Sequence, residues 1–221
     1  IMILALGVDA YIGGVPFLFR LISHPVDLIR KLVRWFDKRL NKEQRGQKDR
    51  AIRGFFTVII ICLITVAIGC GVAWLSRNHP WGWIFEFFLI SSVLNQRNLY
   101  KSIHAVGMAL RDESLEDARR LLSPLTRRDP AHLDQYGIVR VSIETLFEKL
   151  NDHVVAPVFW FILFGLPGLI FYKTINVLDE CIGHPDPKYR AFGFSAARLD
   201  DIVNLIPARL TGLLIIFAAL F

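Results

Sequence analysis

Residues 150–171 read LNDHVVAPVFWFILFGLPGLIF, and this stretch decides how the chain folds. It is apolar enough to lie in a membrane, yet it begins with polar residues. The segments before and after it are dense in Glu, Asp, Arg and Asn. Charged groups beside hydrocarbon cost free energy, so they indicate a function by default. The stretch therefore predicts a membrane protein with a polar site at the membrane surface.

The composition supports this interpretation. Of the 221 residues, 53% are hydrophobic and 12% are aromatic, which is more apolar than an ordinary soluble domain. The length fits one compact unit, so residues 1–221 are expected to form a single membrane domain. No strand alternation persists, so we expect an all-α, polytopic helical membrane protein with a cytoplasmic helical region. The first residues show no charged n-region or cleavage site, so no signal peptide is expected.

The net charge of +6 is concentrated in one segment. Residues 27–53 hold ten Lys and Arg against four acids and directly precede an apolar run, so the positive-inside rule places them in the cytoplasm. Contact with anionic lipids explains such a segment. Nucleic-acid binding is the weaker explanation, because the segment has only two aromatic residues and no recognition module surrounds it. The lipid bilayer is thus the expected partner, and nucleic acid is not.

Five apolar segments are candidates for the membrane. They cover about residues 1–19, 54–75, 81–94, 154–172 and 202–221. The second is the clearest, because it has 22 residues without a charge, about the length of one span. The fourth is interrupted by Gly165-Leu-Pro-Gly168, so it forms either a full span or a re-entrant hairpin, and only the hairpin would leave the polar regions on both sides of it at one membrane face. A polar region at about 95–152 separates the third and fourth segments and is expected on the same, cytoplasmic side as residues 27–53.

Three helices are predicted in this polar region: Gln96 to Leu110, a second from Ser114 to just before Pro124, and a third from about Leu133 toward Lys149. On the third helix Arg140, Glu144 and Glu148 are spaced by four and share a face, which Asp152 extends if the helix continues. Carboxylates that converge in this way are suitable ligands for Mg²⁺. The alternative is a solvated face with one Arg–Glu pair. The three cysteines show no metal-binding spacing.

A second polar set follows the apolar stretch. Lysine and arginine bind phosphate, and aspartate and asparagine bind metals or hydroxyls. The set consists of Lys173, Asn176, Asp179, Arg198, Asp200, Asp201, Asn204 and Arg209. The alternative is a group of interfacial salt bridges. The loop at Arg128 and Asp129 is a candidate phosphate clamp or a solvated turn, and His24 is a candidate ligand or a structural histidine. No standard nucleotide or nucleophile motif is present.

The ordered motifs resemble the adenosylcobinamide-phosphate synthase family of cobalamin biosynthesis. The resemblance covers nearly the whole chain and is densest from Lys101 to Thr211. It rests on these elements: His24-Pro25-Val26, Lys101-Ser102, Ala118-Arg119, Arg128-Asp129, Glu144-Thr145 with Glu148, Asn151-Asp152, residues 154–157 (VVAP), residues 165–168 (GLPG), Tyr172-Lys173, Asn176, Leu178-Asp179, residues 196–201 (AARLDD), Asn204 and residues 207–211 (PARLT).

The resemblance implies a multi-pass protein of the bacterial inner membrane that uses ATP and Mg²⁺. Its implied activity joins the propionate carboxyl of adenosylcobyric acid, a corrinoid, to the amine of aminopropanol phosphate or aminopropanol. On this basis Glu144, Glu148, Asp152 and Lys173 are expected to be catalytic, with the first three as Mg²⁺ ligands. The expected substrate-binding residues are His24, Arg128, Asp129, Asn176, Asp179, Arg198, Asp200, Asp201, Asn204 and Arg209.

The chain departs from the family pattern at several of these motifs. The family's GDP is replaced by Gly13-Gly14-Val15-Pro16, the Thr after Asp129 by Pro130, and the Gly after Asp152 by His153. A catalytically silent homologue that serves as a subunit or scaffold of a membrane complex is therefore the alternative function. A transporter fits less well, because the charges lie at segment ends and no repeat of segments is present.

Overall fold

The computed structural model describes residues 1–12, 24–42, 44–126 and 128–220, and the statements below concern those residues. They form helices and contain no strand, which confirms the all-α prediction. The helices are α1 (Met2–Ile12), α2 (Pro25–Leu40), α3 (Gln47–Asn78), α4 (Gly82–Val93), α5 (Gln96–Arg111), α6 (Leu115–Leu122), α7 (Gln135–Leu150), a π turn (Asn151–Val155), α8 (Ala156–Ile182) and α9 (Phe194–Ala219).

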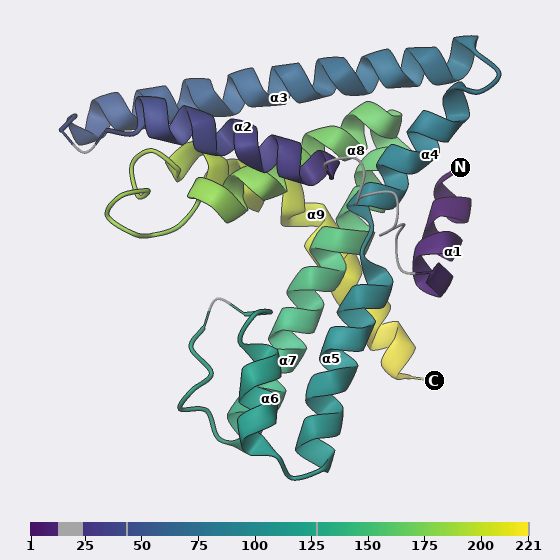
Figure 1. The fold of residues 1–221 in the computed structure, drawn as a ribbon, viewed down its shortest axis with the longest axis vertical. Helices are drawn as coiled ribbons and strands as arrows, with labels where there is room; N and C mark the ends of the chain where they lie inside the picture. Colours follow the sequence, from purple (N-terminus) through teal and green to yellow (C-terminus); the bar gives the residue numbers. More distant parts are fainter. Residues whose placement is uncertain (13–23, 43, 127, 221) are drawn as a thin grey trace.

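The long helix α3 forms one side of the molecule (Figure 1). Helix α2 and the C-terminal part of α8 lie along its N-terminal half, and α9 packs against both α3 and α8. Their shared core is built from Val33, Ile61, Tyr172, Leu178 and Val203. The part of α8 after Gly165 runs antiparallel to α3, because Thr65 bonds to Thr174 at 2.9 Å while Gly69, later in α3, lies against Pro167 and Ile170, earlier in α8.

Three helical stretches are long and apolar enough to cross a membrane: Gln47–Asn78, Gln135–Ile182 and Phe194–Ala219. The first contains the predicted segment 54–75, and the third contains most of the predicted segment 202–221. The prediction of an all-α helical membrane protein is therefore confirmed. The sidedness predicted for residues 27–53 and 95–152 stays a prediction.

Two predicted segments differ from what the structure shows. Helix α4 covers the predicted segment 81–94 with only 12 residues, where a span needs about 20. Its Glu86 accepts a 2.5 Å hydrogen bond from Ser76 at the end of α3, so this acid joins two helices. Helix α1 ends at Ile12, and the rest of the predicted segment 1–19, with its Gly-Gly-Val-Pro departure, lies outside the described residues.

The apolar stretch 150–171 folds back on itself. The hydroxyl of Tyr172 bonds to Asp152 at 3.3 Å, although a continuous α-helix would separate residues 20 positions apart by about 30 Å. The reversal occurs at Gly165, which has φ 66° and ψ −154° and is followed by Pro167. The two legs pack closely, because a Cβ on Gly168 would lie 2.4 Å from the carbonyl oxygen of Trp160. The predicted segment 154–172 is thus a helical hairpin.

We expect Gly165→Ala to destabilise the protein by about 1–3 kcal/mol, because its backbone conformation is essentially restricted to glycine. Thermal unfolding of the purified protein in detergent measures the effect. Gly71→Ala is the matched control, since a Cβ at Gly71 meets no atom within 4 Å and α3 is regular there. Equal melting temperatures for the two variants would contradict the hairpin geometry.

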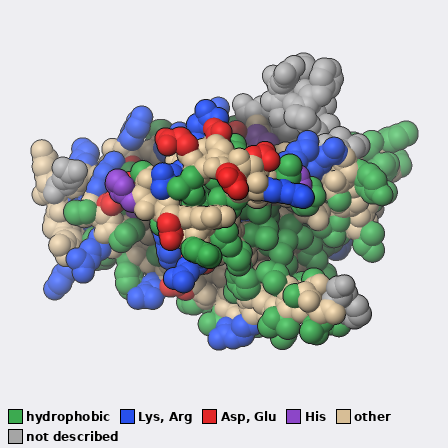
Figure 2. Space-filling view, turned by 90° about the horizontal axis from the view of Figure 1, so that it is seen from below, with side chains coloured by type: hydrophobic (Ala, Val, Ile, Leu, Met, Phe, Trp, Pro, Cys, Tyr) green, Lys and Arg blue, Asp and Glu red, His purple; other side chains and the backbone are tan. Residues whose placement is uncertain are grey.

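Helices α5, α6 and α7 project away from α3 and confirm the three helices predicted in the polar region (Figure 1). They share a small core of Val106, Ala118, Leu122, Ile138 and Val141. Seen from the side toward which they project, acidic and basic side chains mix with hydrophobic ones (Figure 2). The Asp134 side chain starts α7 by accepting a 2.8 Å hydrogen bond from the Gly137 N–H.

Candidate functional site

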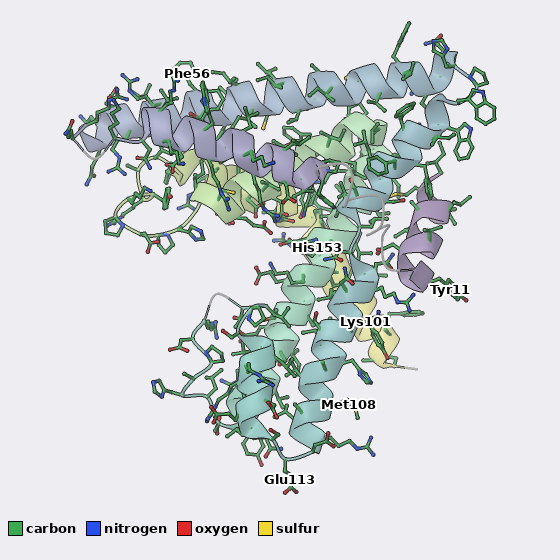
Figure 3. The ribbon with its side chains drawn as sticks, in the orientation of Figure 1. Tyr11, Phe56, Lys101, Met108, Glu113 and His153 are labelled. Carbon is green, nitrogen blue, oxygen red and sulfur yellow. The ribbon has the colours of Figure 1, made fainter. Side chains whose placement is uncertain are left out.

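The π turn between α7 and α8 places the first polar residues of the site. The Ala156 N–H bonds to the Asn151 carbonyl, five residues back, which is the wider π-helical pattern. Single π turns inside helices occur frequently at functional sites. Here the wider turn directs Asn151 and Asp152 toward α8 and α9, and Figure 3 labels the neighbouring His153 at the junction of the projecting helices with the rest of the molecule.

Asn204 of α9 is the centre of a polar cluster, which we define as Asn151, Asp152, Tyr172, Asp200, Asn204 and Thr211. Its side-chain oxygen accepts hydrogen bonds from the Asn151 amide at 2.7 Å and from the Tyr172 hydroxyl at 3.0 Å. Its amide nitrogen donates to Asp200 at 3.0 Å. These bonds join three parts of the chain: the π turn, the part of α8 that follows Gly165, and α9. The cluster therefore depends on the chain reversal at Gly165.

Two more contacts complete the cluster. Asp152 accepts hydrogen bonds from the Asn151 amide at 3.1 Å and from Tyr172. Thr211, one of the fully buried side chains of α9, donates to the Asn151 oxygen at 3.1 Å. The cluster therefore holds two carboxylates in a network of neutral donors, without a cation in direct contact among the described residues. Such groups are well placed to accept a proton or a hydrogen bond from a bound molecule.

Lys173 is a buried cation one residue beyond Tyr172. Only 3% of its surface is exposed, and its ammonium donates a 2.7 Å hydrogen bond to Asn176. Further along α8, Glu180 forms a 3.1 Å ion pair with Arg30 of α2. Burial of a charged group costs free energy unless partners compensate it, so the buried Lys173 is costly to keep without a function. Arg30 and Glu180 are only half-buried, so their pair costs less.

His24 lies at the start of α2, close enough to Arg30 and Lys173 for their charges to act on it. Its Nδ1 accepts a 3.3 Å hydrogen bond from the Val26 N–H and caps the helix. Burial lowers the pKa of His24; Asp27 opposes this shift, and Arg30 and Lys173 add to it. A neutral imidazole can accept this bond, so capping of α2 alone accounts for the position of His24.

Two buried polar atoms beside the cluster have no hydrogen-bond partner among the described residues: the Asp200 Oδ1 and the His153 Nδ1. Buried polar atoms in folded proteins are usually satisfied, so each exception requires an explanation. Both atoms belong to residues within or next to the polar cluster. A hydrogen-bonding ligand at this place would satisfy them.

The expected metal ligands do not come together. Glu144 lies at the surface in a 3.0 Å ion pair with Arg128, and Glu148 is exposed near Lys149. Asp152 instead points into the cluster, because the π turn takes it off the carboxylate stripe. Within the described ranges no group of three His, Cys, Asp or Glu side chains could hold a metal ion. The described residues therefore form no three-ligand cage, and an Mg²⁺ ion bound here would take most of its ligands from substrate phosphates and water. The Mg²⁺ site stays a prediction, and we assign no step to it.

Of the other predicted site residues, the structure brings only some to the cluster. Asp200 and Asn204 belong to it, and Lys173 and Asn176 lie beside it. Asp179 is half-buried on α8, and both Asp179 and Asp201 lie close enough to Asp200 for their charges to repel that carboxylate. The remaining residues are exposed: Arg128 with Glu144, Asp129 capping the Ala131 N–H, Arg198 paired with Asp201 at 3.3 Å, and Arg209 bonded to the Leu205 carbonyl.

Sequence reasoning misses three members of the cluster as site residues: Asn151, Tyr172 and Thr211. Each is a polar residue within or next to an apolar run, and two of them are direct neighbours of predicted site residues. A polar residue at such a place is the feature of the sequence that could have identified these three site residues. The ion pair of Arg30 with Glu180 is missed as well, because nothing in the sequence places residues 150 positions apart side by side.

An all-helical fold with three candidate spans defines a protein of the membrane class, and a polar cluster at a broken helix within it is a candidate functional site. The chain belongs to the CobD/Cbib protein family, whose family model matches residues 2–221. No solved structure matches it significantly.

Curated relatives agree with this family. A protein named "Cobalamin biosynthesis protein CobD" in Brucella anthropi is 40% identical over 97% of this chain and 66% of the relative. A protein of the same name in Sinorhizobium is 39% identical over 100% of this chain and 68% of the relative. One in Rhodobacter capsulatus is 38% identical over 99% of this chain and 68% of the relative. The chain thus spans about two thirds of the length of these relatives.

Proposed function

We propose that this protein acts in cobalamin biosynthesis, in the bacterial inner membrane, as an ATP-dependent amide-forming ligase. Its substrates would be adenosylcobyric acid, which is a corrinoid, and aminopropanol phosphate or aminopropanol. The family and the names of its relatives support the pathway. The observation that supports a site for chemistry is the buried polar cluster, with its two unpartnered atoms and Lys173 beside it.

The reaction explains why such a cluster is needed. A carboxylate does not react with an amine until it is activated. In the proposed route the carboxylate oxygen attacks the γ-phosphorus of ATP, ADP leaves, and an acyl phosphate forms. The amine then attacks the acyl carbon, the C–O bond to phosphate breaks, and phosphate departs as the nitrogen loses a proton. A base must accept that proton, and cations must hold the anionic groups together.

We assign these tasks to residues by their position. Asp152 is the proposed proton acceptor, because it is a carboxylate without a direct cationic partner among the described residues. Lys173 of α8 and Arg30 of α2 are the proposed anion-binding groups, since Lys173 is the cation beside the cluster and Arg30 pairs with Glu180 two turns further along α8. Asn204 and Tyr172 position Asp152 within the cluster.

The direct test is an assay of the purified protein with adenosylcobyric acid, aminopropanol phosphate and Mg-ATP. We expect the amide to form only when ATP is present, with one ADP released per amide. Mass spectrometry of the corrinoid product and an ADP assay measure both. Absence of the amide from a folded protein with all substrates present would reject the ligase proposal.

One observation favours a catalytically silent homologue as second candidate. Arg128, Asp129 and Glu144, which the family resemblance implicates in the site, lie at the surface rather than at the polar cluster. A silent homologue would act as a subunit or scaffold of a membrane complex. It would be inactive as wild type in the same assay and would be recovered from membranes together with a protein partner.

A further inference from the structure

A groove lies where the start of α3 meets the loop between α8 and α9. It is lined by Gln47, Lys48, Ala51, Pro185, Pro187, Arg190, Ala191 and Phe194 and has a cavity volume of about 580 Å³. Its two charged side chains, Lys48 and Arg190, are both cations, and no acidic side chain of the described residues lines it. Neither cation forms an ion pair within the part of the chain that the structure describes.

The loop that forms one wall is firmly held. The Asn41 amide bonds to the Lys188 carbonyl at 3.2 Å, and Arg50 donates to the same carbonyl. Asn41 also bonds to the buried Asp37 at 2.9 Å, and the hydroxyl of Tyr189 bonds to Asp37 at 3.3 Å. On α3, Asp49 follows Lys48 directly but is already paired with Arg53 at 3.0 Å. The wall is therefore fixed in place. Its Lys188 pairs with Asp37 at 3.8 Å, whereas the two cations that line the groove, Lys48 and Arg190, have no acidic partner among the described residues.

The groove continues into an apolar stripe on α3. Lys48, Ile52, Phe55 and Ile59 follow one another at three- and four-residue intervals and so share one face of the helix. Ile52, Phe55 and Ile59 are 56%, 50% and 36% exposed. The neighbouring Phe56, which Figure 3 labels on α3, is also exposed. This stripe enters the uncharged residues 54–75 of a candidate span.

We propose that this groove binds the phosphodiester headgroup of an anionic phospholipid, whose acyl chains lie along the apolar stripe of α3. Two cations attract the phosphate, and basic pockets at the ends of membrane helices bind anionic headgroups by this chemistry. A soluble phosphate would satisfy Lys48 and Arg190 but would leave the exposed stripe without a partner. The apolar continuation therefore favours a lipid as the occupant.

The test uses the purified protein in a neutral detergent, with phosphatidylglycerol or phosphatidylcholine added and bound lipid counted by native mass spectrometry. Wild type is expected to prefer phosphatidylglycerol. Each of Lys48→Gln and Arg190→Gln is expected to weaken that binding about fivefold, and the double variant about 25-fold, at about 1 kcal/mol for each cation. The charge-preserving pair Lys48→Arg and Arg190→Lys should retain the preference and shows that the groove has folded.

The control is Lys31→Gln with Lys38→Gln, which removes the same charge from exposed positions of α2 outside the groove. An equal loss of binding in this control would overturn the proposal, because general surface charge would then explain it. Wild-type binding in the Lys48 and Arg190 double variant would overturn it as well. Displacement of the lipid by millimolar inorganic phosphate at constant ionic strength would assign the groove to a soluble anion instead.

Discussion

Asp152→Asn is expected to reduce amide formation by about 10²- to 10⁴-fold while membrane insertion and stability stay close to those of wild type. Asparagine has nearly the same shape, and its side-chain oxygen can still accept the hydrogen bond of Tyr172. It cannot carry the negative charge or accept the proton of the attacking amine. The loss should appear as a fall in single-turnover rate at saturating substrate, and thermal unfolding should report an unchanged fold.

Asp112→Asn is the matched control, because it makes the same chemical change at an exposed residue at the end of α5, away from the polar cluster. It should leave the turnover at the wild-type value. If Asp152→Asn retains more than a tenth of the wild-type rate, Asp152 is not the proton acceptor. If the wild type itself makes no amide, the silent homologue becomes the better explanation, and Asp152 keeps only its structural bonds.

The helices that the sequence predicts correctly are those with a strong local signal. Residues 54–75 have no charge and become the centre of α3, and the three helices of the polar region have clear periodicity and end at Pro124 or a loop. The predicted segment 81–94 becomes α4, a helix of only 12 residues, which is shorter than one span, so its place in the membrane stays a prediction. Hydrophobicity shows that a helix is apolar, whereas its length depends on where the chain turns.

The site is harder to predict, because it depends on two features without a local signal. The π turn changes which residues share a face, so the four-residue spacing that links Asp152 to Glu144 and Glu148 ceases to apply. The Gly-Leu-Pro-Gly motif indicates the reversal at Gly165 but not the residues that the reversal brings together. That Tyr172 meets Asp152, and that Asn204 bonds to both Asn151 and Tyr172, follows from tertiary packing alone.

The structure also shows how His153 is accommodated at a position where the family pattern has a glycine. A histidine in place of a glycine raises the prospect of a backbone conformation that histidine tolerates poorly. Among the residues described, Glu113 is the only non-glycine residue with a positive φ, so His153 has a backbone that suits its side chain. The substitution therefore adds no backbone strain. What it adds is a buried imidazole nitrogen without a hydrogen-bond partner among those residues, which bears on what binds there and not on whether the chain folds.

Asn204→Asp is expected to destabilise the protein more than any other single change in the cluster, by about 2–4 kcal/mol. The substitution keeps the shape of the side chain but removes the donor whose hydrogen bond Asp200 accepts at 3.0 Å. It also places a third carboxylate between Asp152 and Asp200, where like charges repel one another in a partly buried setting. Chemical or thermal unfolding of the purified protein in detergent measures the loss.

Adding Asp200→Asn to this variant should restore most of the lost stability, because it exchanges the amide and the carboxylate between two positions one turn apart on α9. The amide now at position 200 would donate to the carboxylate now at position 204, which can still accept the hydrogen bonds of Asn151 and Tyr172. The number of negative charges in the cluster returns to that of the wild type. Asp200→Asn alone gives the reference needed for the double-mutant cycle. A double variant no more stable than Asn204→Asp would show that the hydrogen bonds around position 204 do not hold the π turn, α8 and α9 together.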